Sequence, residues 1–562
     1  MTTSNRDDYI LFGTTQGVLS VVDATTGKEK FAFVPNEMVA SQKKAFLEYT
    51  TTSGFSTSTY QPFYYGVDAP WTQYSEYVVQ SDGTMTVGSG IGTSTGVQMA
   101  YGGLRMGGRS YYALNLQDMN APKLAFRIDP NTSAVYYNGS STSYNELSYM
   151  GQSWSKPTIG FVKWNGKKTR VMFVGGGYDA GGTNGDGSFD STTGERTGFS
   201  GYEGSSYTQT NNIGAGVYMF NAETGALLWW TGANATNANT TSGVGYSTAS
   251  NMQFSISSQI KGIDRNSDGL IDHLYFGDLG GQFWRVDLNN NLSSFDKDLF
   301  SKTPVRLLNL HNGIYSPRFY EMPAFSTYSN SGTTFGVASI GSGNRSLPRF
   351  NSSSTSYKND AIYNIYDKDV ARSDLYSMTN ATYQVCAAQN TGSTVDCKGA
   401  ALNTQNATLS TLGQLTTNAN TTAVAPYSTT NGWYYYFTSQ LIQDAKVLST
   451  PIVLDSDMYV TTFDGSKDGL SGDCGAGVKG ESYVYQFCMP YGVCTAAQIT
   501  ASTFLNGSGL GAGIVSPAVG SNNNNGSNRA LISTTGSLAG GASKDYSTPL
   551  SLVPIRWYET GK

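Results

Sequence analysis

Short apolar segments of about five residues, separated by glycine-containing turns, recur along the chain. Each copy consists of an apolar strand, a tight turn, a second apolar strand ending in Asp or Asn, and a Thr-Gly turn. Such a pattern predicts antiparallel hairpins. The clearest copies, followed by weaker ones, are Tyr9–Gly27, Val171–Gly175 with Gly216–Trp229, Leu274–Asp287, Tyr111–Asn115, Phe335–Gly341 and Met458–Phe463.

A single small antiparallel sheet cannot bury both of its faces. Several such sheets arranged radially bury their faces against one another and leave only short edges. The sequence therefore predicts an all-β fold, a modified β-propeller of about seven blades with long inserted loops and a few short helices. We expect one propeller domain over residues 1–562. A sandwich of several sheets is the alternative architecture.

Three stretches interrupt the repeats and predict insertions at about residues 38–100, 178–212 and 376–430. The first contains a helix candidate near Val39–Tyr49, and the other two are rich in Gly, Asn, Ser and Thr. Long loops on a rigid scaffold commonly carry binding function. Mobile decoration is the alternative for residues 178–212 and 398–430.

Charged residues make up only 13% of the chain and the net charge is −5. A nucleic-acid-binding protein would present a basic face, so we expect no nucleic-acid partner. No apolar run reaches the roughly 18 residues of a membrane helix, so no transmembrane segment is expected. The polar start Met1–Asn5 is unlike a signal peptide, and a strand pattern begins at Tyr9. We therefore expect a fragment of a longer precursor whose N-terminal part is absent.

The five cysteines predict disulfides rather than a zinc or redox site, because no Cys-x-x-Cys pair occurs. We expect a Cys386–Cys397 disulfide and a second one that joins Cys474 to Cys488 or Cys494, with one cysteine left over. Five buried free thiols are the alternative. Disulfides indicate an oxidising compartment, either the periplasm or the cell surface.

One segment carries the spacing of a calcium loop. Side chains at positions 1, 3, 5 and 9 of such a loop and the carbonyl at position 7 supply the hard oxygen ligands that Ca²⁺ prefers, while Gly269 at position 6 permits the sharp turn. The predicted ligands are Asp264, Asn266, Asp268, the carbonyl of Leu270, and Asp272. A metal-free turn is the alternative, but three neighbouring carboxylates would then repel one another. Mg²⁺ suits such a multi-carboxylate cage less well.

The loop departs from the helix–loop–helix version of such sites. Position 12, where that version has a glutamate, is Tyr275, within a strand pattern. The preceding segment Phe254–Ile260 also alternates like a strand, so we predict a strand–loop–strand site anchored to the core by Ile271. Asp278, after the next strand, is interpreted as a turn residue.

Other candidate sites carry weaker signals. The Asp-Gly stretch Asn184–Asp190 lacks the full calcium register, and we interpret it as a turn. The two histidines, His273 and His311, have no nucleophile motif beside them, so structural roles are expected. No phosphate loop or dinucleotide fingerprint is present.

Several segments together resemble the C-terminal domain of the PilY/PilC family of type IV pilus tip proteins. The most specific are the opening blade and the calcium blade, and shorter landmarks follow them along nearly the whole chain. These segments are Tyr9–Pro35, Asp264–Leu288, Trp154–Pro157, Gly432–Tyr434, Ser449–Pro451 and Ile555–Trp557.

The resemblance implies a secreted protein that passes through the periplasm and outer membrane to the pilus tip. Such proteins sit on minor pilins, support pilus assembly, oppose retraction, and contribute to twitching motility, virulence and adhesion to host-cell or abiotic surfaces. In the family, calcium occupancy is linked to the balance of extension and retraction. The matching ligands are those at positions 264, 266, 268, 270 and 272.

Two other functions compete with this interpretation. Gly216–Trp229 also resembles the repeat of propeller quinoprotein (PQQ-like) dehydrogenases, but the adjacent cysteine pair typical of those enzymes does not occur here. A scaffold propeller of the periplasm is the other alternative. We expect a binding protein rather than an enzyme.

Overall fold

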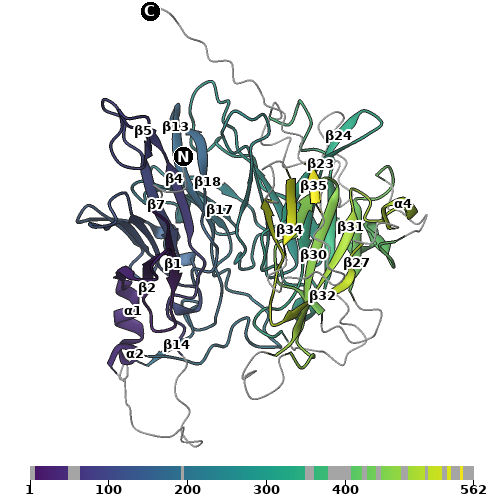
Figure 1. The fold of residues 1–562 in the computed structure, drawn as a ribbon, viewed down its shortest axis with the longest axis horizontal. Coiled ribbons are helices and arrows are strands. Elements are labelled where there is room, and N and C mark those ends of the chain that lie inside the picture. Colours follow the sequence, from purple (N-terminus) through teal and green to yellow (C-terminus); the bar gives the residue numbers. More distant parts are fainter. Residues whose placement is uncertain are drawn as a thin grey trace, which may run out of the picture.

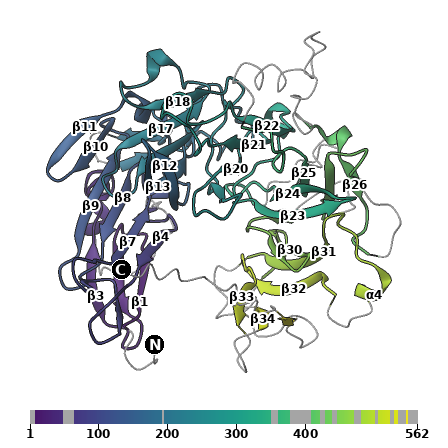
Figure 2. The ribbon, with the colours of Figure 1, turned by 90° about the horizontal axis from the view of Figure 1, so that it is seen from above.

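Strands make up most of the structure. They form seven sheets of three to six strands and two further two-stranded sheets within the described part of the chain. The seven larger sheets follow one another in chain order around an open ring (Figures 1 and 2). The predicted modified β-propeller with about seven blades is confirmed. The computed structural model describes residues 7–47, 64–190, 195–348, 360–376, 407–419, 427–437, 445–469, 479–499, 504–521, 528–532 and 545–547.

The N-terminal half of the ring holds the first three sheets. The six-stranded second sheet has the order β11-β10-β9-β8-β7-β4, and the third runs β12-β13-β16-β17-β18. The strands of the three sheets are β1 (Tyr9–Gly13), β2 (Leu19–Asp23) and β3 (Glu29–Phe33); β4 (Thr72–Glu76), β7 (Val97–Gly102), β8 (Tyr111–Asn115), β9 (Lys123–Asp129), β10 (Ala134–Tyr137) and β11 (Ser140–Ser143); β12 (Thr158–Trp164), β13 (Lys167–Gly175), β16 (Val217–Asn221), β17 (Leu227–Gly232) and β18 (Gly245–Thr248).

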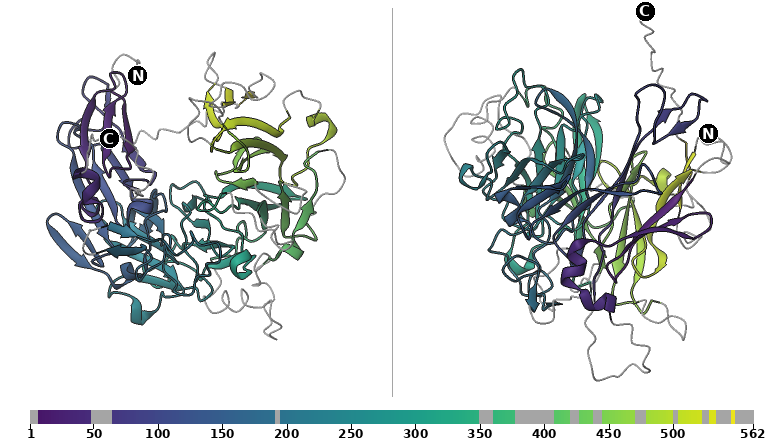
Figure 3. Two further views of the ribbon diagram at one scale, coloured as in Figure 1. Left: turned by 90° about the horizontal axis from the view of Figure 1, so that it is seen from below. Right: turned by 90° about the vertical axis from the view of Figure 1, so that its left-hand side faces the viewer.

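The remaining four sheets complete the ring, and the first and last sheets flank its open side (Figure 3). The strands of these four sheets are β19 (Lys261–Ile263), β20 (His273–Gly277), β21 (Gln282–Asp287) and β22 (Val305–Asn309); β23 (Ala324–Asn330), β24 (Thr333–Gly341), β25 (Ala361–Asp367), β26 (Gly413–Leu415) and β27 (Gly432–Tyr436); β28 (Ala445–Val447), β29 (Ile452–Leu454), β30 (Asp457–Asp464), β31 (Glu481–Cys488) and β32 (Asn506–Ala512); β33 (Ala518–Ser521), β34 (Asn528–Ile532) and β35 (Asp545–Ser547).

The predicted hairpins are present as antiparallel neighbours. β1 pairs with β2, β13 with β16, and β20 with β21. No described strand from the beginning of the chain pairs with one from its end, so a shared sheet does not close the ring in these residues.

The hydrophobic core is divided into layers between successive sheets, as expected when the sheets pack face to face. Each layer contains buried residues from both neighbouring sheets. Going round the ring from the first sheet to the sixth, one buried residue from each side of every layer is Leu19 and Leu114, Tyr101 and Tyr218, Phe173 and Phe276, Phe283 and Tyr363, and Trp433 and Val460.

Two predicted insertions contribute to the blades themselves. Residues 38–100 supply β4 and most of β7, together with the small hairpin of β5 (Val78–Val79) and β6 (Met85–Thr86). The pattern missed β4 because Tyr74 is its only large apolar residue. Part of the third insertion forms β26, which pairs in parallel with β27, while much of residues 376–430 lies outside the described residues.

The second insertion, residues 178–212, contains a two-stranded hairpin of β14 (Ser188–Asp190) and β15 (Glu195–Thr197). Two short helices, α1 (Asn36–Ser41) and α2 (Lys43–Leu47), replace the single helix expected near Val39–Tyr49. A third, α4 (Ala496–Ile499), lies near the C-terminal sheets. Of the helices that the structure describes, none is both long and apolar enough to cross a membrane.

Candidate metal centre

The predicted calcium loop, Asp264–Asp272, connects β19 to β20. These strands pair antiparallel, with Ile263 opposite His273 at the base of the loop. The predicted strand–loop–strand arrangement is confirmed, although the strand before the loop is β19. The segment Phe254–Ile260, which we expected to be that strand, makes only an isolated bridge at Ser255.

The exposed part of the loop is held by hydrogen bonds from its own backbone. The Asp264 carboxylate accepts the N–H groups of Ser267 at 2.7 Å and Gly269 at 2.8 Å. Asp268 Oδ1 accepts the N–H of Leu270 at 2.8 Å, and Asn266 Nδ2 donates to Asp268 Oδ2 at 3.0 Å. The polar side chains predicted as ligands therefore fold into one compact turn.

Two residues of this turn have positive φ, Ser267 at 62° and Gly269 at 80°. Glycine adopts this conformation without steric cost, which explains its place at position 6 of the loop. A Cβ added at Gly269 would lie 3.0 Å from Lys168 Nζ, so an ammonium group approaches the acidic loop from β13.

The fifth predicted ligand, Asp272, is buried at the base of the hairpin. Its Oδ2 accepts the N–H of Arg265 at 2.9 Å, and its Oδ1 accepts Asn290 Nδ2 at 3.0 Å. The Asp272 side chain is 5% exposed, unlike the exposed Asp264 and Asp268. The five predicted ligands therefore combine an exposed turn with a buried anchor.

The donor set suits Ca²⁺, because it consists of hard carboxylate, amide and carbonyl oxygens. Asp264 Oδ2, both oxygens of Asp268 and both oxygens of Asp272 each accept one hydrogen bond and keep a second lone pair, whereas Asp264 Oδ1 accepts two. In the part of the chain that the structure describes, however, no group of three or more His, Cys, Asp or Glu side chains is gathered closely enough to hold a metal ion. The residues fit the ion by chemistry and loop shape, and holding it requires the carboxylates of the loop to turn toward a common centre.

Ile271 anchors the loop to the core, as predicted. Its backbone N–H donates to Phe161 O of the neighbouring sheet at 2.7 Å. Its side chain lies over Gly160 and Gly262, where an added Cβ would approach Ile271 Cδ1 to 2.4 and 2.8 Å. The two glycines leave the space that Ile271 fills, so the position of the loop is set by packing between two blades.

A fully buried network of charged groups lies beneath the loop. His273 Nδ1 lies 2.6 Å from Asp287 Oδ1, and Arg285 Nε lies 2.9 Å from the same oxygen. Arg285 Nη1 also contacts both oxygens of Asp367, at 2.6 and 2.7 Å, and Tyr275 donates its hydroxyl to Asp367 at 2.9 Å. Tyr275, at position 12, therefore faces this network rather than the loop, and His273 has the expected structural role.

His311, the second histidine, also makes structural contacts. Its ring stacks on Phe254 with the centroids 4.4 Å apart, and its Nδ1 lies 3.0 Å from Gly280 O and 3.2 Å from Ser316 Oγ. The Ser316 hydroxyl donates to Gly313 O at 2.8 Å, so its proton is already engaged. His311 and Ser316 both lie in the loop after β22.

Asp278 is a buried turn residue between β20 and β21, as predicted. Its carboxylate accepts the N–H groups of Gly280 and Gln282, each at 2.9 Å, and the Trp284 indole N–H at 3.0 Å. Burial raises the pKa of Asp278 to about 7, against the opposing effect of these hydrogen bonds. The carboxyl thus closes the turn between β20 and β21 in the fourth sheet.

The weaker candidate, Asn184–Asp190, is a turn that leads into β14, and its Asp186 joins a largely buried ion cluster. Asp186 accepts Arg196 Nε at 2.7 Å and Gln152 Nε2 at 2.9 Å. Arg196 Nη2 also donates to Glu37 of α1 at 2.9 Å. No local sequence pattern marks this cluster, because Glu37 and Gln152 lie far along the chain from the residues they contact.

The disulfide pattern corrects one expectation. Cys488 pairs with Cys494, not with Cys474. The chain turns back directly after β31, where the Gly492 N–H donates to Cys488 O at 2.8 Å, and this brings the two Cα atoms to 4.9 Å. Cys386, Cys397 and Cys474 lie outside the described residues.

Comparison with solved structures gives a match over nearly the whole chain. No protein-family model and no curated protein sequence matches the chain. The C-terminal domain of Pseudomonas aeruginosa PilY1 is similar in structure, with a TM-score of 0.56 and 16% sequence identity, over 97% of this chain and 94% of that one. The chain therefore has the fold of that domain.

Two other solved propellers match less well. BamB from Moraxella catarrhalis has a TM-score of 0.23 and 10% identity over 65% of this chain and 69% of that one. A quinohemoprotein alcohol dehydrogenase from Pseudomonas putida has a TM-score of 0.29 and 13% identity over 81% of this chain and 61% of that one. Both scores are too low to support an argument about this chain.

Proposed function

We propose that this chain is the propeller domain of a type IV pilus tip protein and that it acts by binding rather than by catalysis. The supporting observation is the shared fold with the PilY1 C-terminal domain over nearly the whole of both chains. The sequence landmarks of the PilY/PilC family, in the first and fourth sheets, agree with it. The proposed roles are pilus assembly, control of retraction, twitching motility and adhesion to surfaces or host cells, with minor pilins as partners.

We further propose that the Asp264–Asp272 loop holds one Ca²⁺ ion. The ligands would be the side chains of Asp264, Asn266, Asp268 and Asp272 and the carbonyl of Leu270. Bound calcium would neutralise the carboxylates and fix the loop in one conformation. Ile271 and Asp272 already anchor the loop between two blades. Fixing the loop with calcium would therefore also fix the surface of the blade next to it, because the loop connects two strands of that blade.

The partner proposal is tested by capture of purified minor pilins on the immobilised chain, with calcium and with a chelator. We expect capture in calcium and weaker capture in chelator, because we propose that the blade edge fixed by calcium, with its neighbouring loops, contacts the minor pilins. Equal capture in both conditions would leave the pilus role standing but remove the ion from it. No capture in either condition would contradict the proposed partner.

Calcium binding is tested by substituting Asp268 with Ala. The substitution removes one charged ligand, so we expect the calcium affinity measured by titration calorimetry to fall roughly tenfold or more. The fold should survive, because Asp268 is exposed and propeller blades share stability through their neighbours.

The matched control for Asp268→Ala is Asp82→Ala. Asp82 also closes an exposed turn, through Thr84 N and Oγ1 at 2.9 and 2.6 Å, but lies in no predicted calcium register. Its loss should leave calcium affinity unchanged.

Wild-type twitching and adhesion in an Asp268→Ala strain with demonstrably lost calcium would refute a regulatory role for the ion.

A further inference from the structure

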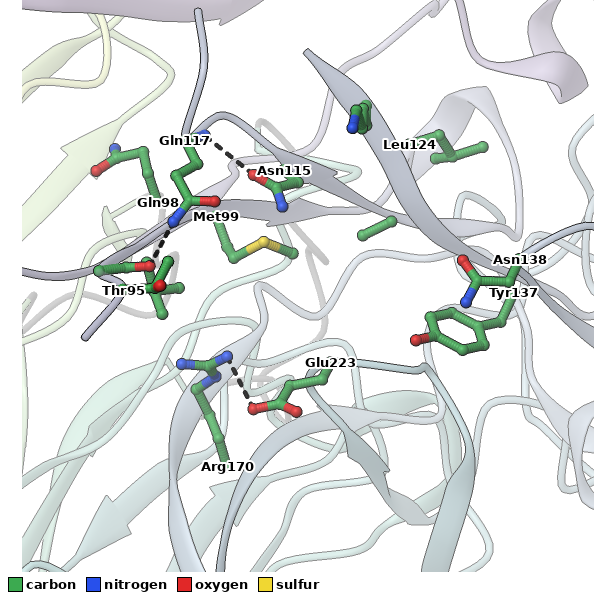
Figure 4. Close-up of a pocket in the computed structure, with 14 residues that line it drawn as sticks. Thr95, Gln98, Met99, Asn115, Gln117, Leu124, Tyr137, Asn138, Arg170 and Glu223 are labelled. Carbon is green, nitrogen blue, oxygen red and sulfur yellow. Dashed lines mark hydrogen bonds and ion pairs between the residues drawn. The ribbon is translucent and has the colours of Figure 1, made fainter. Parts of the chain in front are cut away.

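A cavity of about 450 Å³ lies between the second and third sheets, far in sequence from the calcium loop (Figure 4). Strands β7 to β10 provide one side of it. The third sheet contributes Arg170 from β13 and Glu223 from the turn between β16 and β17. The volume lies within the range of about 300–1,000 Å³ that is usual for small-molecule sites.

The two sides of the cavity are fixed to each other by inter-blade contacts. Tyr101 of β7 donates its hydroxyl to Ala222 O at 2.8 Å, and the Ala222 N–H donates to Arg170 O at 3.0 Å. The Arg170 guanidinium lies 3.1 Å from Glu223 and 3.4 Å from Glu76. The cavity is therefore preformed by strands and a paired charge, and a ligand need not order a loop to enter it.

Two amide side chains line the cavity in the same way, each with one end fixed and the other end free. Gln117 Nε2 donates to Val87 O and Gly96 O, and Asn115 Oδ1 accepts the Gln117 N–H. Gln117 Oε1 and Asn115 Nδ2 have no hydrogen-bond partner among the residues that the structure places. The cavity thus presents both acceptors and donors with fixed orientations.

Apolar surface lies opposite these amides. Tyr137 and Leu124 remain 38% and 50% exposed at the cavity, and Figure 4 shows both across the cavity from Gln117 and Asn115. The charges at the cavity cancel, because the two cations Arg170 and Lys123 are balanced by Glu223 in the lining and by Glu76, which pairs with Arg170. The site therefore has no uncompensated charge with which to select a charged ligand.

We propose that this cavity binds a neutral saccharide unit. A sugar hydroxyl both donates and accepts hydrogen bonds, which matches fixed amide donors and acceptors, and the C–H face of the ring packs against an aromatic side chain such as Tyr137. A purely apolar ligand would leave the amides without partners. The site gives the chain a glycan contact, and its binding in solution does not depend on the pilus role proposed above.

The test is saturation-transfer-difference NMR with D-glucose, D-galactose, D-mannose and N-acetyl-D-glucosamine as neutral probes and N-acetylneuraminic acid as the acidic probe. The variants are Tyr137→Ala, which removes the ring, and Asn115→Asp, which keeps the acceptor for the Gln117 N–H but removes the free amide donor. The matched control is Tyr77→Ala, because Tyr77 is 54% exposed and does not line the cavity. Thermal unfolding checks that each variant is folded.

We expect at least one neutral sugar to bind, with affinity roughly tenfold weaker in Tyr137→Ala and Asn115→Asp and unchanged in Tyr77→Ala. Binding of the acidic probe alone would overturn the neutral class of ligand. Neutral-sugar binding that survives both variants would place the site elsewhere, and the absence of binding by every probe would overturn the proposal. None of these outcomes bears on pilin capture, so the two proposals fail separately.

Discussion

Replacing Arg285 with methionine will lower the free energy of unfolding by about 3–5 kcal/mol. Arg285 is fully buried between Asp287 and Asp367, and its guanidinium contacts both carboxylates. Methionine fills a similar volume but removes the guanidinium that contacts both carboxylates. Removing one partner of a buried ion pair is costly because the remaining charge is no longer compensated in a medium that solvates it poorly.

The measurement is denaturant unfolding followed by tryptophan fluorescence, together with hydrogen exchange of the fourth and fifth sheets. Lys297→Met is the matched control, because its partner Asp298 is also 2.7 Å away but both side chains are substantially exposed. Exposed pairs contribute about 0–1 kcal/mol, so the control should change little. An equally small effect of Arg285→Met would show that the aspartates do not depend on the arginine.

A rescue separates lost charge from lost packing. Combining Arg285→Met with Asp287→Asn and Asp367→Asn removes all three charges and should recover much of the stability. Replacing a whole buried ion cluster by uncharged groups often leaves the free energy of unfolding unchanged, whereas removing one member of the cluster lowers it. Failure of the triple variant to recover would indicate that packing, not charge, is the main contribution of Arg285.

Replacing Glu37 with alanine is expected to have the second largest effect, also about 3–5 kcal/mol. The Glu37 carboxylate is 8% exposed and accepts four hydrogen bonds from other parts of the chain. The donors are Ser110 N at 3.0 Å, Arg109 N and Asn131 Nδ2 at 3.1 Å, and Arg196 Nη2 at 2.9 Å. Alanine leaves these buried donors without an acceptor.

The damage should be local as well as global. Glu37 belongs to α1 and joins it to the second sheet and to the β14–β15 hairpin. Hydrogen exchange should therefore increase first in α1 and the hairpin. Glu37→Gln keeps the size and one acceptor, so its effect should be smaller than that of alanine. Equal loss in both variants would indicate that the negative charge is the main contribution of Glu37.

The same site predicts a pH dependence. Burial alone would raise the pKa of Glu37, but the charge of Arg196 and the hydrogen bonds outweigh it and hold the pKa below its usual value of 4.5. A carboxyl with a lowered folded-state pKa stabilises the fold above its unfolded pKa, and this contribution is lost as the pH falls through the folded value. The stability difference between wild type and Glu37→Gln should therefore shrink below about pH 4.5.

The pKa of Asp186, which lies on the other side of Arg196, shifts in the opposite direction to that of Glu37. Burial raises its pKa despite the neighbouring arginine. Its contribution to stability is present at low pH and is lost as the pH rises through the folded value. The charge of Glu37 also contributes to the raised pKa of Asp186, so the comparison of wild type with Glu37→Gln reports the two carboxyls together.

The sequence by itself determined the features that depend on local spacing. Apolar alternation and glycine turns predicted the hairpins, because a strand's two faces differ every second residue. Tyr275 occupies position 12, where a helix–loop–helix site has a ligand, and this predicted a strand after the acidic loop. The apolar side chain of Ile271 predicted that the loop is anchored to the core. β4 was missed for the same reason, because its single large apolar residue gives almost no alternation.

Only the tertiary structure decided which distant residues meet. Arg285 and Asp367 are 82 positions apart, and Arg196 and Glu37 are 159 apart. The sequence does not show that these charged side chains are buried, because the residue type is the same whether water or a neighbouring blade surrounds the side chain. The cavity between the second and third sheets likewise exists only once the two sheets pack. The Cys488–Cys494 pairing depends on a turn whose direction is set by the sheet it leaves, since disulfide bonding requires proximity in space and spacing along the chain does not specify it.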